Sequence, residues 1–291
     1  MIDRSKLIKA FVFSGLIYAL TGLFQFIGLT EIVTLDGRIS GFLGSANYLA
    51  MYLLPLILLS ASYWMYDFFI TKARSTYMWN ELVVVLAMIF VLGLTVSYNA
   101  FLALLFAGVY LIFRLRLVQA ALVFVSIFIV FLVTQLGSEK LMQAFEFDDR
   151  SSSSVRTEVY EVTGQLISER PLTGYGLGSY ESVYLQQAPR ILEKAPMEWV
   201  MIHPHNTFLS FFYQLGIFGA VWFVILLLFY WAKLQKFVDR VDRRQAIALS
   251  SAFLGILFLS LFDTHFWKND FAVQFFLLLW LIDSVRQKHT L

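Results

Sequence analysis

The chain has 291 residues, of which 59% are hydrophobic and 14% charged, and its mean hydropathy is +0.72. Soluble domains carry about 25% charged residues, so the composition excludes a soluble globular protein and predicts a polytopic integral membrane protein of the all-α class. The absence of cysteine excludes a disulfide framework, thiolate chemistry and a cysteine metal site. The net charge of +2 says little, because in membrane proteins the placement of charge matters more than its sum.

Apolar runs near the roughly 20 residues that a helix needs to cross the hydrocarbon core predict about eight transmembrane helices. The first run is longer than the apolar region of a signal peptide and no small-residue cleavage site follows it, so we expect a retained span. The third and fourth runs are separated only by Ser97, Tyr98 and Asn99, which predicts a tight hairpin. The eight runs are Leu7–Leu29, Asn47–Tyr66, Leu82–Ser97, Ala100–Phe113, Leu117–Leu136, Leu215–Trp231, Ala246–Phe262 and Phe271–Asp283.

The placement of Lys and Arg predicts that both termini are cytoplasmic, because basic residues concentrate in the loops on that side of a membrane. With the N-terminus inside, the short outer segments contain only Arg38 and Lys268. The short inner segments contain Arg4, Lys6, Lys9, Lys72, Arg74, Arg114, Arg116, Lys233, Lys236, Arg240, Arg243, Arg244, Arg286 and Lys288.

One outer segment, Gly137–Pro204, is far longer than the usual connection between packed helices. It divides the chain into an N-terminal membrane region (1–136, five spans), a large extracytoplasmic loop (137–204) and a C-terminal membrane region (205–291, three spans). Within the loop, apolar residues recur at helical spacing, at Val155, Val159, Val162 and Leu166. This pattern predicts a helix that a serine can cap and that Pro171 ends.

Three alternating glycines, Gly174, Gly176 and Gly178, follow this predicted helix. Their spacing is not that of a dinucleotide fingerprint, and no strand precedes them. We therefore expect a compact loop whose backbone can approach another group closely.

The middles of the predicted spans lack acidic, basic and histidine residues, which argues against an ion-coupled transporter or a pump. We expect the function on the outer surface, where His203, His205 and His265 are predicted to lie. A neutral imidazole, whose ordinary pKa is near 6.5, can accept a proton from a hydroxyl group. Two alternatives are interfacial histidines satisfied by water or carbonyls, and a zinc site formed by His203, His205 and a carboxylate such as Asp263.

Two arginines in outer segments, Arg38 and Arg156, are candidate ligands for an anion. The long loop carries more acidic than basic residues, so any anion site must be local and built from guanidinium groups that bind phosphate oxygens in pairs. Alternatively, Arg38 anchors a lipid headgroup and Arg156 forms an exposed ion pair with Glu158 or Glu161.

Four stretches of the sequence carry motifs. His205-Asn206 is followed after nine residues by Gly216-Ile217-Phe218-Gly219, at the outer end of a late span. The other three are RISGFLGSANYLAMYL, which begins at Arg38 and includes Asn47, RTEVYEVTGQLISERPLTGYGLGSY, which begins at Arg156, and GLFQFIGL. Taken together, the four resemble the O-antigen ligase and polymerase family of membrane glycosyltransferases, which has an Arg-led motif entering a helix, an Arg-led helix with a Gly turn, and a glutamine-bearing span. The resemblance runs from about Gly22 to Trp280.

This resemblance implies a metal-independent, inverting transfer of a glycan from an undecaprenyl-diphosphate-linked donor, outside the bacterial cytoplasmic membrane. His205 is then the catalytic base, Arg38 and Arg156 bind the diphosphate, and Asn206 orients His205 or caps its helix. The remaining candidate substrate-binding residues are His203, Asn47 and Tyr98. Expected partners are the donor, a lipid, glycan or protein acceptor, the bilayer and other envelope glycan assembly proteins, with no cofactor, metal or nucleic acid.

The sequence departs from the family pattern at Tyr98. The family has a Ser-Arg pair at the outer end of a middle span, whereas this chain reads TVSYNA, with Tyr98 in place of the arginine. The chain is also shorter at its N-terminus than its relatives. Two other functions stay open: a translocator of lipid-linked glycans or small anions, and a catalytically inactive accessory subunit. From the glycines of the HN motif, Gly216 and Gly219, we expect packing points that let this span pass close to another helix.

Overall fold

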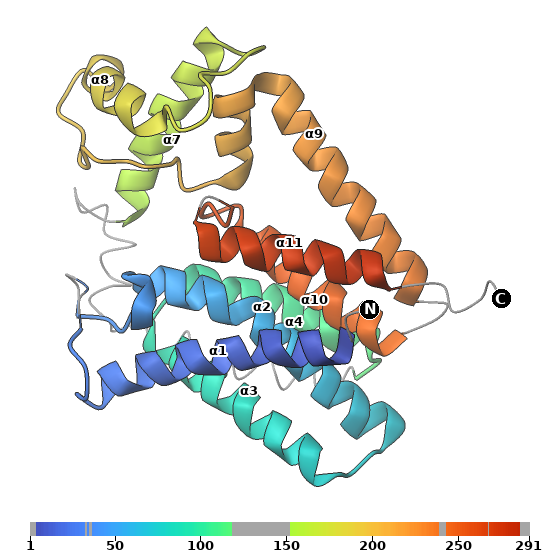
Figure 1. Cartoon of the computed structure of the whole chain (residues 1–291). Helices are drawn as coiled ribbons and strands as arrows, with labels where there is room; N and C mark the ends of the chain where they lie inside the picture. The colour runs from blue at the N-terminus through green and yellow to red at the C-terminus, as the bar shows by residue number, and fades with distance from the viewer. Residues whose placement is uncertain are drawn as a thin grey trace. The chain divides into compact units, whose positions relative to one another are not determined.

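A computed structural model describes residues 4–32, 34, 37–117, 152–238, 243–266 and 268–285. These residues form helices and loops, with no strand in any of the described ranges, which confirms the predicted all-α class there (Figure 1). The chain divides into two compact units. The first comprises Met1–Phe124, Tyr230–Leu259 and Trp267–Leu291, and the second comprises Val125–Phe229 and Ser260–Phe266.

The first unit is a helix bundle built around α2 (Ala46–Met65). This helix packs against α1, α3, α4 and α10, and its side chains are buried all round, with Leu49, Leu53 and Leu56 fully inaccessible. Burial on every side explains why α2 reads in the sequence as a continuous apolar run without a polar face. The other helices are α1 (Arg4–Phe26), α3 (Thr76–Leu94), α4 (Tyr98–Arg114), α10 (Arg243–Leu259) and α11 (Asn269–Ser284), with short η1 (Gly41–Leu43) and η2 (Tyr66–Thr71).

The helices coincide with the predicted spans wherever the structure describes them. Three are long and apolar enough to cross a membrane: Arg4–Phe26, Ala46–Thr71 and Thr207–Val238. The apolar helices Met78–Leu94 and Tyr98–Arg114 are shorter, and Thr95–Ser97 between α3 and α4 forms the predicted tight hairpin. The predicted fifth span, Leu117–Leu136, lies outside the described residues except for its first position, so the number of spans stays a prediction.

The second unit contains α7 (Ser152–Glu169), α8 (Tyr180–Leu192) and the beginning of α9 (Thr207–Val238). The predicted apolar stripe forms its core, with Val159, Val162 and Leu166 fully buried against tyrosines of α8 and α9. The sequence analysis predicted one helix in this loop and missed α8. The signal for α8 was present in Tyr180, Tyr184 and Ala188, which recur every four residues and are all buried.

Helix α9 is kinked at Gly216, where it packs against residues 170–179, the loop between α7 and α8 that contains the three glycines and is called the glycine loop below. Gly216 has φ 65° and ψ −167°, so the helix is interrupted there. The carbonyl of Tyr213 accepts from the N–H of Tyr175 at 2.8 Å, and the N–H of Ile217 donates to the carbonyl of Pro171 at 2.8 Å. The kink therefore exchanges a helical hydrogen bond for two bonds to the loop, a recognised cause of helix bending.

The expected packing of Gly216 and Gly219 against another helix stays a prediction, because their nearest described neighbours are of a different kind. A Cβ at Gly216 would lie 2.1 Å from the carbonyl oxygen of Leu172, so the close neighbour is the backbone of the glycine loop. A Cβ at Gly219 would lie 2.1 Å from the Cβ of Leu215, on the same helix across the kink. Among the described residues, the nearest neighbours of both glycines are therefore the loop before α8 and α9 itself, and not a second helix. The compact loop itself is confirmed, because a Cβ at Gly174 would lie 2.6 Å from backbone atoms of Gln214.

Candidate functional site

Asn206 fixes the start of α9 beside the segment that follows α10. Its Oδ1 accepts from the N–H of Leu209 at 3.0 Å, which is the hydrogen bond of a helix N-cap. Its Nδ2 donates to the carbonyl of Leu261 at 2.9 Å, and the N–H of Thr207 donates to the carbonyl of Ser260 at 2.9 Å. Of the two roles predicted for Asn206, these bonds show the capping role. They also place His205 next to residues 260–264.

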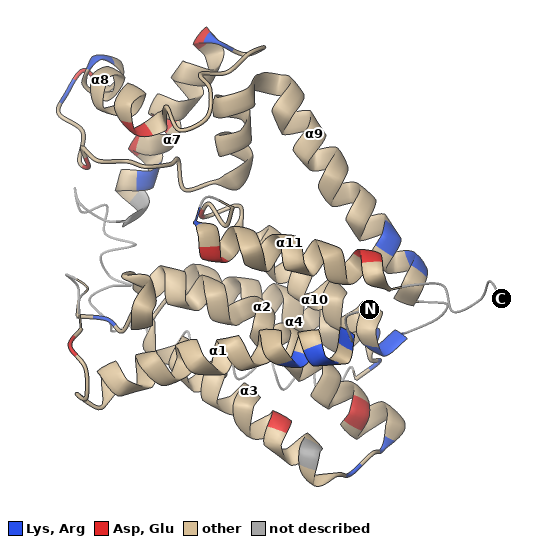
Figure 2. Ribbon diagram, viewed as in Figure 1, with Lys and Arg blue, Asp and Glu red and all other residues tan. Residues whose placement is uncertain are grey.

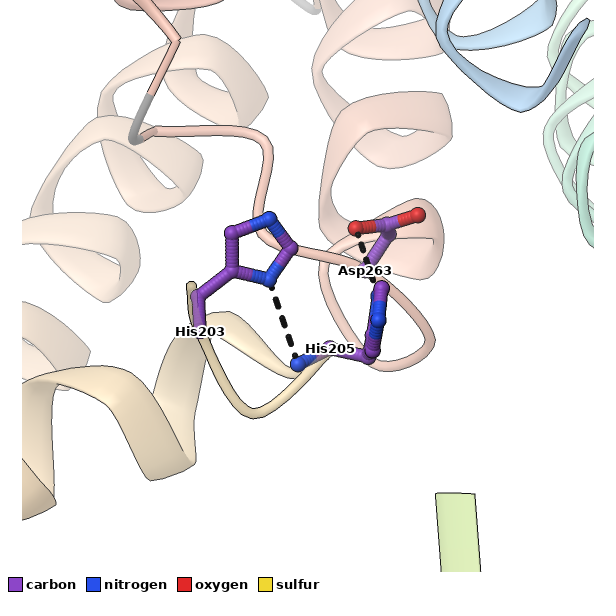
Figure 3. A group of neighbouring side chains, drawn as sticks. All are labelled: His203, His205 and Asp263. Atoms are coloured by element: carbon purple, nitrogen blue, oxygen red, sulfur yellow. Dashed lines mark hydrogen bonds and ion pairs between the residues drawn. The ribbon is translucent and has the colours of Figure 1, made fainter. Parts of the chain in front are cut away.

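His205 lies against the carboxylate of Asp263. Nδ1 of His205 is 3.4 Å from Oδ1 of Asp263, a long hydrogen-bond distance, and the pair is shown in Figure 3. The side chain of His205 is 26% exposed and that of Asp263 is 6% exposed. The imidazole therefore has one nitrogen at a buried acid, while part of the ring remains open to solvent.

The environment of Asp263 favours its ionised form. Burial raises its pKa, but the hydrogen bond from His205, the charges of His205 and His203, and the N–H of Thr264 outweigh burial and lower the pKa to about 2. The Thr264 N–H donates to Oδ1 at 2.8 Å. Because an ionised carboxylate only accepts hydrogen bonds, the proton of a neutral His205 belongs on Nδ1. Nε2 then carries the lone pair that can accept a proton from another molecule.

His203 supports the backbone of His205 from a buried position. It is 6% exposed, its Nδ1 lies 3.0 Å from Oγ1 of Thr264, and the N–H of His205 donates to the same Nδ1 at 3.4 Å. The two rings meet edge to face with centroids 4.8 Å apart. His205 itself has φ 48°, a left-handed conformation that is uncommon outside glycine. The bond to His203 helps to hold this unfavourable conformation.

The same three residues could hold a metal ion. One ligand atom from each of His203, His205 and Asp263 can be chosen so that all lie within 4.8 Å of one another. Imidazole nitrogen and carboxylate oxygen are ligands that zinc accepts, so the zinc alternative agrees with this geometry. In the structure, however, Nδ1 of His203 is engaged by Thr264 and by the His205 N–H.

Helix α7 brings Arg156 to this site through Tyr160, one turn further along. The hydroxyl of Tyr160 donates to the carbonyl of His205 at 3.3 Å. Burial raises the pKa of Tyr160, the positive charge of Arg156 lowers it and the charge of Asp263 raises it, with a net increase. The hydrogen bond of Tyr160 to the backbone of His205 therefore connects α7, the helix that carries Arg156, to the histidine segment. Glu158, a suggested partner of Arg156, pairs with Lys194 at 2.6 Å.

The remaining candidates belong to the first unit, where Arg38 lies at the α3–α4 connection. Its Nη1 donates to the carbonyl of Thr95 at 3.1 Å, three residues before Tyr98 at the start of α4. Gln25 of α1 fixes the loop that carries Arg38, because its Oε1 accepts from the N–H groups of Ser40 and Gly41, each at 2.8 Å. Asn47 is the second residue of α2 and is partly buried.

The predicted site residues thus form two groups, each described within its own unit. The second unit brings together His203, His205, Asn206 and Arg156, and the first contains Arg38, Asn47 and Tyr98. The sequence analysis missed Asp263 as the partner of His205, and missed Thr264 and Tyr160 entirely. The signal that could have found Asp263 is its position directly after an apolar run, in the stretch Phe262–His265 that also carries a histidine.

Comparisons with known proteins agree with the resemblance. Residues 83–224 match the family model described as O-Antigen ligase. The matched stretch includes Tyr98, Arg156, His203, His205 and Asn206, whereas Arg38, Asn47 and Asp263 lie outside it. A Rickettsia conorii protein provisionally named a polysaccharide ligase is 23% identical over 200 residues, which cover 65% of this chain and 47% of the relative. The chain therefore spans about half the length of the curated relative that it matches.

Proposed function

Because residues 83–224 carry an O-antigen ligase domain, we propose that this membrane protein transfers or polymerises a glycan from an undecaprenyl-diphosphate-linked donor. The reaction takes place on the outer face of the bacterial cytoplasmic membrane. The observation that carries the proposal is the pairing of a part-exposed His205 with a buried, ionised Asp263. Such a pair is the arrangement in which a histidine acts as a general base with a fixed tautomer.

In the proposed reaction, Nε2 of His205 takes the proton of an acceptor hydroxyl. The acceptor oxygen forms a bond to the anomeric carbon of the donor as the bond from that carbon to the diphosphate oxygen breaks. A single displacement of this kind inverts the configuration of the anomeric carbon. The carboxylate of Asp263 stabilises the imidazolium that His205 becomes, so Asp263 acts as a positioning residue.

The diphosphate that leaves is proposed to bind Arg156 and Arg38. Guanidinium groups can hold two phosphate oxygens at once and can stabilise the departing negative charge without a metal ion. Arg38 is oriented by the carbonyl of Thr95, and Tyr98 nearby offers one neutral hydroxyl donor. The proposed substrate-binding residues also include Asn47, Asn206 and His203. Asn206 and His203 contribute by hydrogen bonds that position the backbone around His205.

The charge distribution of the helix bundle supports the proposed orientation. In the first unit, Lys and Arg gather at the end where α1 begins (Figure 2). Basic residues concentrate on the cytoplasmic side of membranes, so this end is proposed to face inward, with both termini. Arg38 and the α3–α4 hairpin lie on the opposite side of the predicted spans, in outer segments.

Replacement of the proposed base tests this function most directly. In proteoliposomes supplied with lipid-linked donor and acceptor, His205→Ala is expected to lower the formation of new glycosidic bonds by about 10²- to 10⁴-fold. Gln186→Ala, an exposed change on α8, is the control and is expected to retain wild-type turnover. Normal turnover in His205→Ala would remove His205 from the role of base.

Three further measurements separate the remaining possibilities. A chelator is expected to leave turnover unchanged, whereas loss of activity that zinc restores would favour a metal at His203, His205 and Asp263. Deletion of the gene followed by electrophoresis of surface glycans distinguishes a polymerase, which loses long chains, from a ligase, which leaves free lipid-linked chains. Movement of labelled donor across proteoliposomes without any new glycosidic bond would identify a translocator instead.

A further inference from the structure

Two adjoining cavities lie in the first unit among α1, α2, α3 and the start of α10. The larger, of about 450 Å³, is lined mainly by apolar side chains such as Val12, Phe13, Leu16 and Val84. The second has about 400 Å³. Four residues line both cavities, which makes them contiguous: Ile8, Lys9, Tyr63 and Glu81. Each volume falls within the range of about 300–1,000 Å³ that is usual for small-molecule sites.

The second cavity is polar, and three of its lining residues are basic. Its lining includes the cations Arg4, Lys9 and Arg244 together with the carboxylate of Glu81. Arg244 forms an ion pair with Asp67, and its guanidinium carbon lies 4.5 Å from the centroid of the Tyr63 ring. These contacts hold the Arg244 guanidinium at the cavity. The other two basic residues of the lining, Arg4 and Lys9, come from the first turns of α1.

The joined cavities have the layout of an amphiphile, with a basic compartment at one end and an apolar compartment beside it. The basic compartment lies where α1 and α10 begin, at the end of the bundle where Lys and Arg gather (Figure 2). Basic pockets between transmembrane helices on the cytoplasmic side are recognition sites for anionic lipid headgroups. The apolar compartment runs along α1 away from that end, from Lys9 toward Leu16, in the direction that a lipid chain would take into the bilayer.

We propose that these two cavities form one binding site for an anionic phospholipid of the cytoplasmic leaflet. The phosphate lies among Arg4, Lys9 and Arg244, and an acyl chain follows Val12, Leu16 and Val84. The donor of the proposed glycan transfer does not fit this site, because its diphosphate belongs on the outer face. The inference is independent of the proposed function, and its readout is lipid binding by the protein.

The test uses purified full-length protein stripped of lipid in detergent, with dioleoyl phosphatidylglycerol or dioleoyl phosphatidylethanolamine added, and native mass spectrometry as the readout. We expect one retained phosphatidylglycerol per protein. Lys9→Gln is expected to weaken its binding by about fivefold, since one basic residue near a membrane surface contributes about that factor. Lys6→Gln removes the same charge from an exposed residue of α1 outside both linings and is expected to bind as the wild type.

A second pair of variants tests the apolar compartment. Val84→Trp fills the larger cavity, while Val83→Trp adds the same bulk at a neighbouring residue that is 65% exposed. The proposal predicts lost phosphatidylglycerol binding in Val84→Trp and retained binding in Val83→Trp. Equal retention of phosphatidylethanolamine, equal weakening by Lys6→Gln, or unchanged binding in both Lys9→Gln and Val84→Trp would overturn it. Lys9 is on the surface, so its variant stays informative even where Val84→Trp fails to fold.

Discussion

The two units hold their functional side chains in different ways. In the second unit, His205 is matched to a group of opposite charge, the buried carboxylate of Asp263. In the first unit, the described bond that orients Arg38 runs instead from its guanidinium to the backbone carbonyl of Thr95. A side chain therefore positions the functional group in the second unit, whereas the turn between α3 and α4 positions it in the first.

The largest effect is expected where the second unit depends on backbone geometry. Gly216→Ala places a Cβ against the carbonyl oxygen of Leu172 in a left-handed conformation, so either the loop or α9 must move. We expect a loss of about 3 kcal/mol or more in stability, measured as loss of folded protein in detergent. Gly164→Ala in α7, where a Cβ meets no other atom, is expected to be neutral or to stabilise the protein by up to about 1 kcal/mol. Equal stability of the two variants would show that the kink is dispensable.

The next largest effect is expected from removing the positive charge of Arg156 on α7, in the second unit. Arg156→Ala is expected to lower turnover by about 10²- to 10³-fold, as loss of a group that stabilises developing charge does, and Arg156→Lys is expected to recover only part of it. Turnover and donor KM in proteoliposomes are the measurements. Arg190→Ala, which removes an exposed arginine of α8 that pairs with Glu169 of α7, serves as the control. A wild-type rate in Arg156→Ala would show that the charge on α7 has no part in transfer.

A further test replaces Asp263 by asparagine, which removes the charge of the side chain but keeps its shape. Asp263→Asn can no longer fix the tautomer of His205, and we expect at least about a tenfold lower turnover with donor KM little changed. Turnover that stays at the wild-type level would mean that the carboxylate does not act through His205.

The difference in stability between the wild type and Asp263→Asn should also depend on pH. The pKa of Asp263 is lowered from 3.8 to about 2, so its ionised form stabilises the folded state above the unfolded value near pH 4. This contribution, roughly 2 kcal/mol, is lost as the pH falls from 4 to 2. Thermal unfolding in detergent should therefore show an advantage of the wild type over Asp263→Asn that shrinks as the pH falls from 4 to 2. A constant difference across the whole range would contradict the lowered pKa.

The smallest effect is expected in the first unit, from restoring the arginine of the family pattern. Tyr98→Arg adds a second guanidinium near Arg38, and we expect donor KM to fall about fivefold, since a charge-assisted hydrogen bond to a diphosphate is stronger than one from a neutral hydroxyl. Tyr98→Phe, which removes the hydroxyl, is expected to raise donor KM slightly. If both variants keep the wild-type KM, position 98 does not contact the donor.

Local periodicity predicted much of the fold. The apolar runs of α1, α2 and α9 are visible in composition alone, and the spacing of Val159, Val162 and Leu166 identified α7. Helix α8 was missed because it follows three glycines and carries Pro189 near its end, so its tyrosine spacing was masked by residues typical of loops.

The site was predictable only in part, because its contacts are tertiary. His205 and Asn206 stand in a recognisable motif, but Asp263 lies 58 residues further along and has no periodic signal that connects it to His205. The same holds for the bond from Arg38 to Thr95, 57 residues away. The left-handed conformation of Gly216 was also invisible, since a glycine in an apolar run is equally typical of helix packing.

The bend in α9 also sets a length. After Gly216, residues 217–238 continue as one helix, and at about 1.5 Å per residue they are just sufficient to traverse a hydrocarbon layer of about 30 Å. The residues before the kink are surplus to that crossing. They can therefore run at another angle, so the helical segment capped by Asn206 is held at one end of a membrane-spanning helix. An insertion between Gly216 and Lys233 would lengthen the spanning helix. An insertion between Asn206 and Gly216 would instead rotate the capped segment and move His205 away from Asp263.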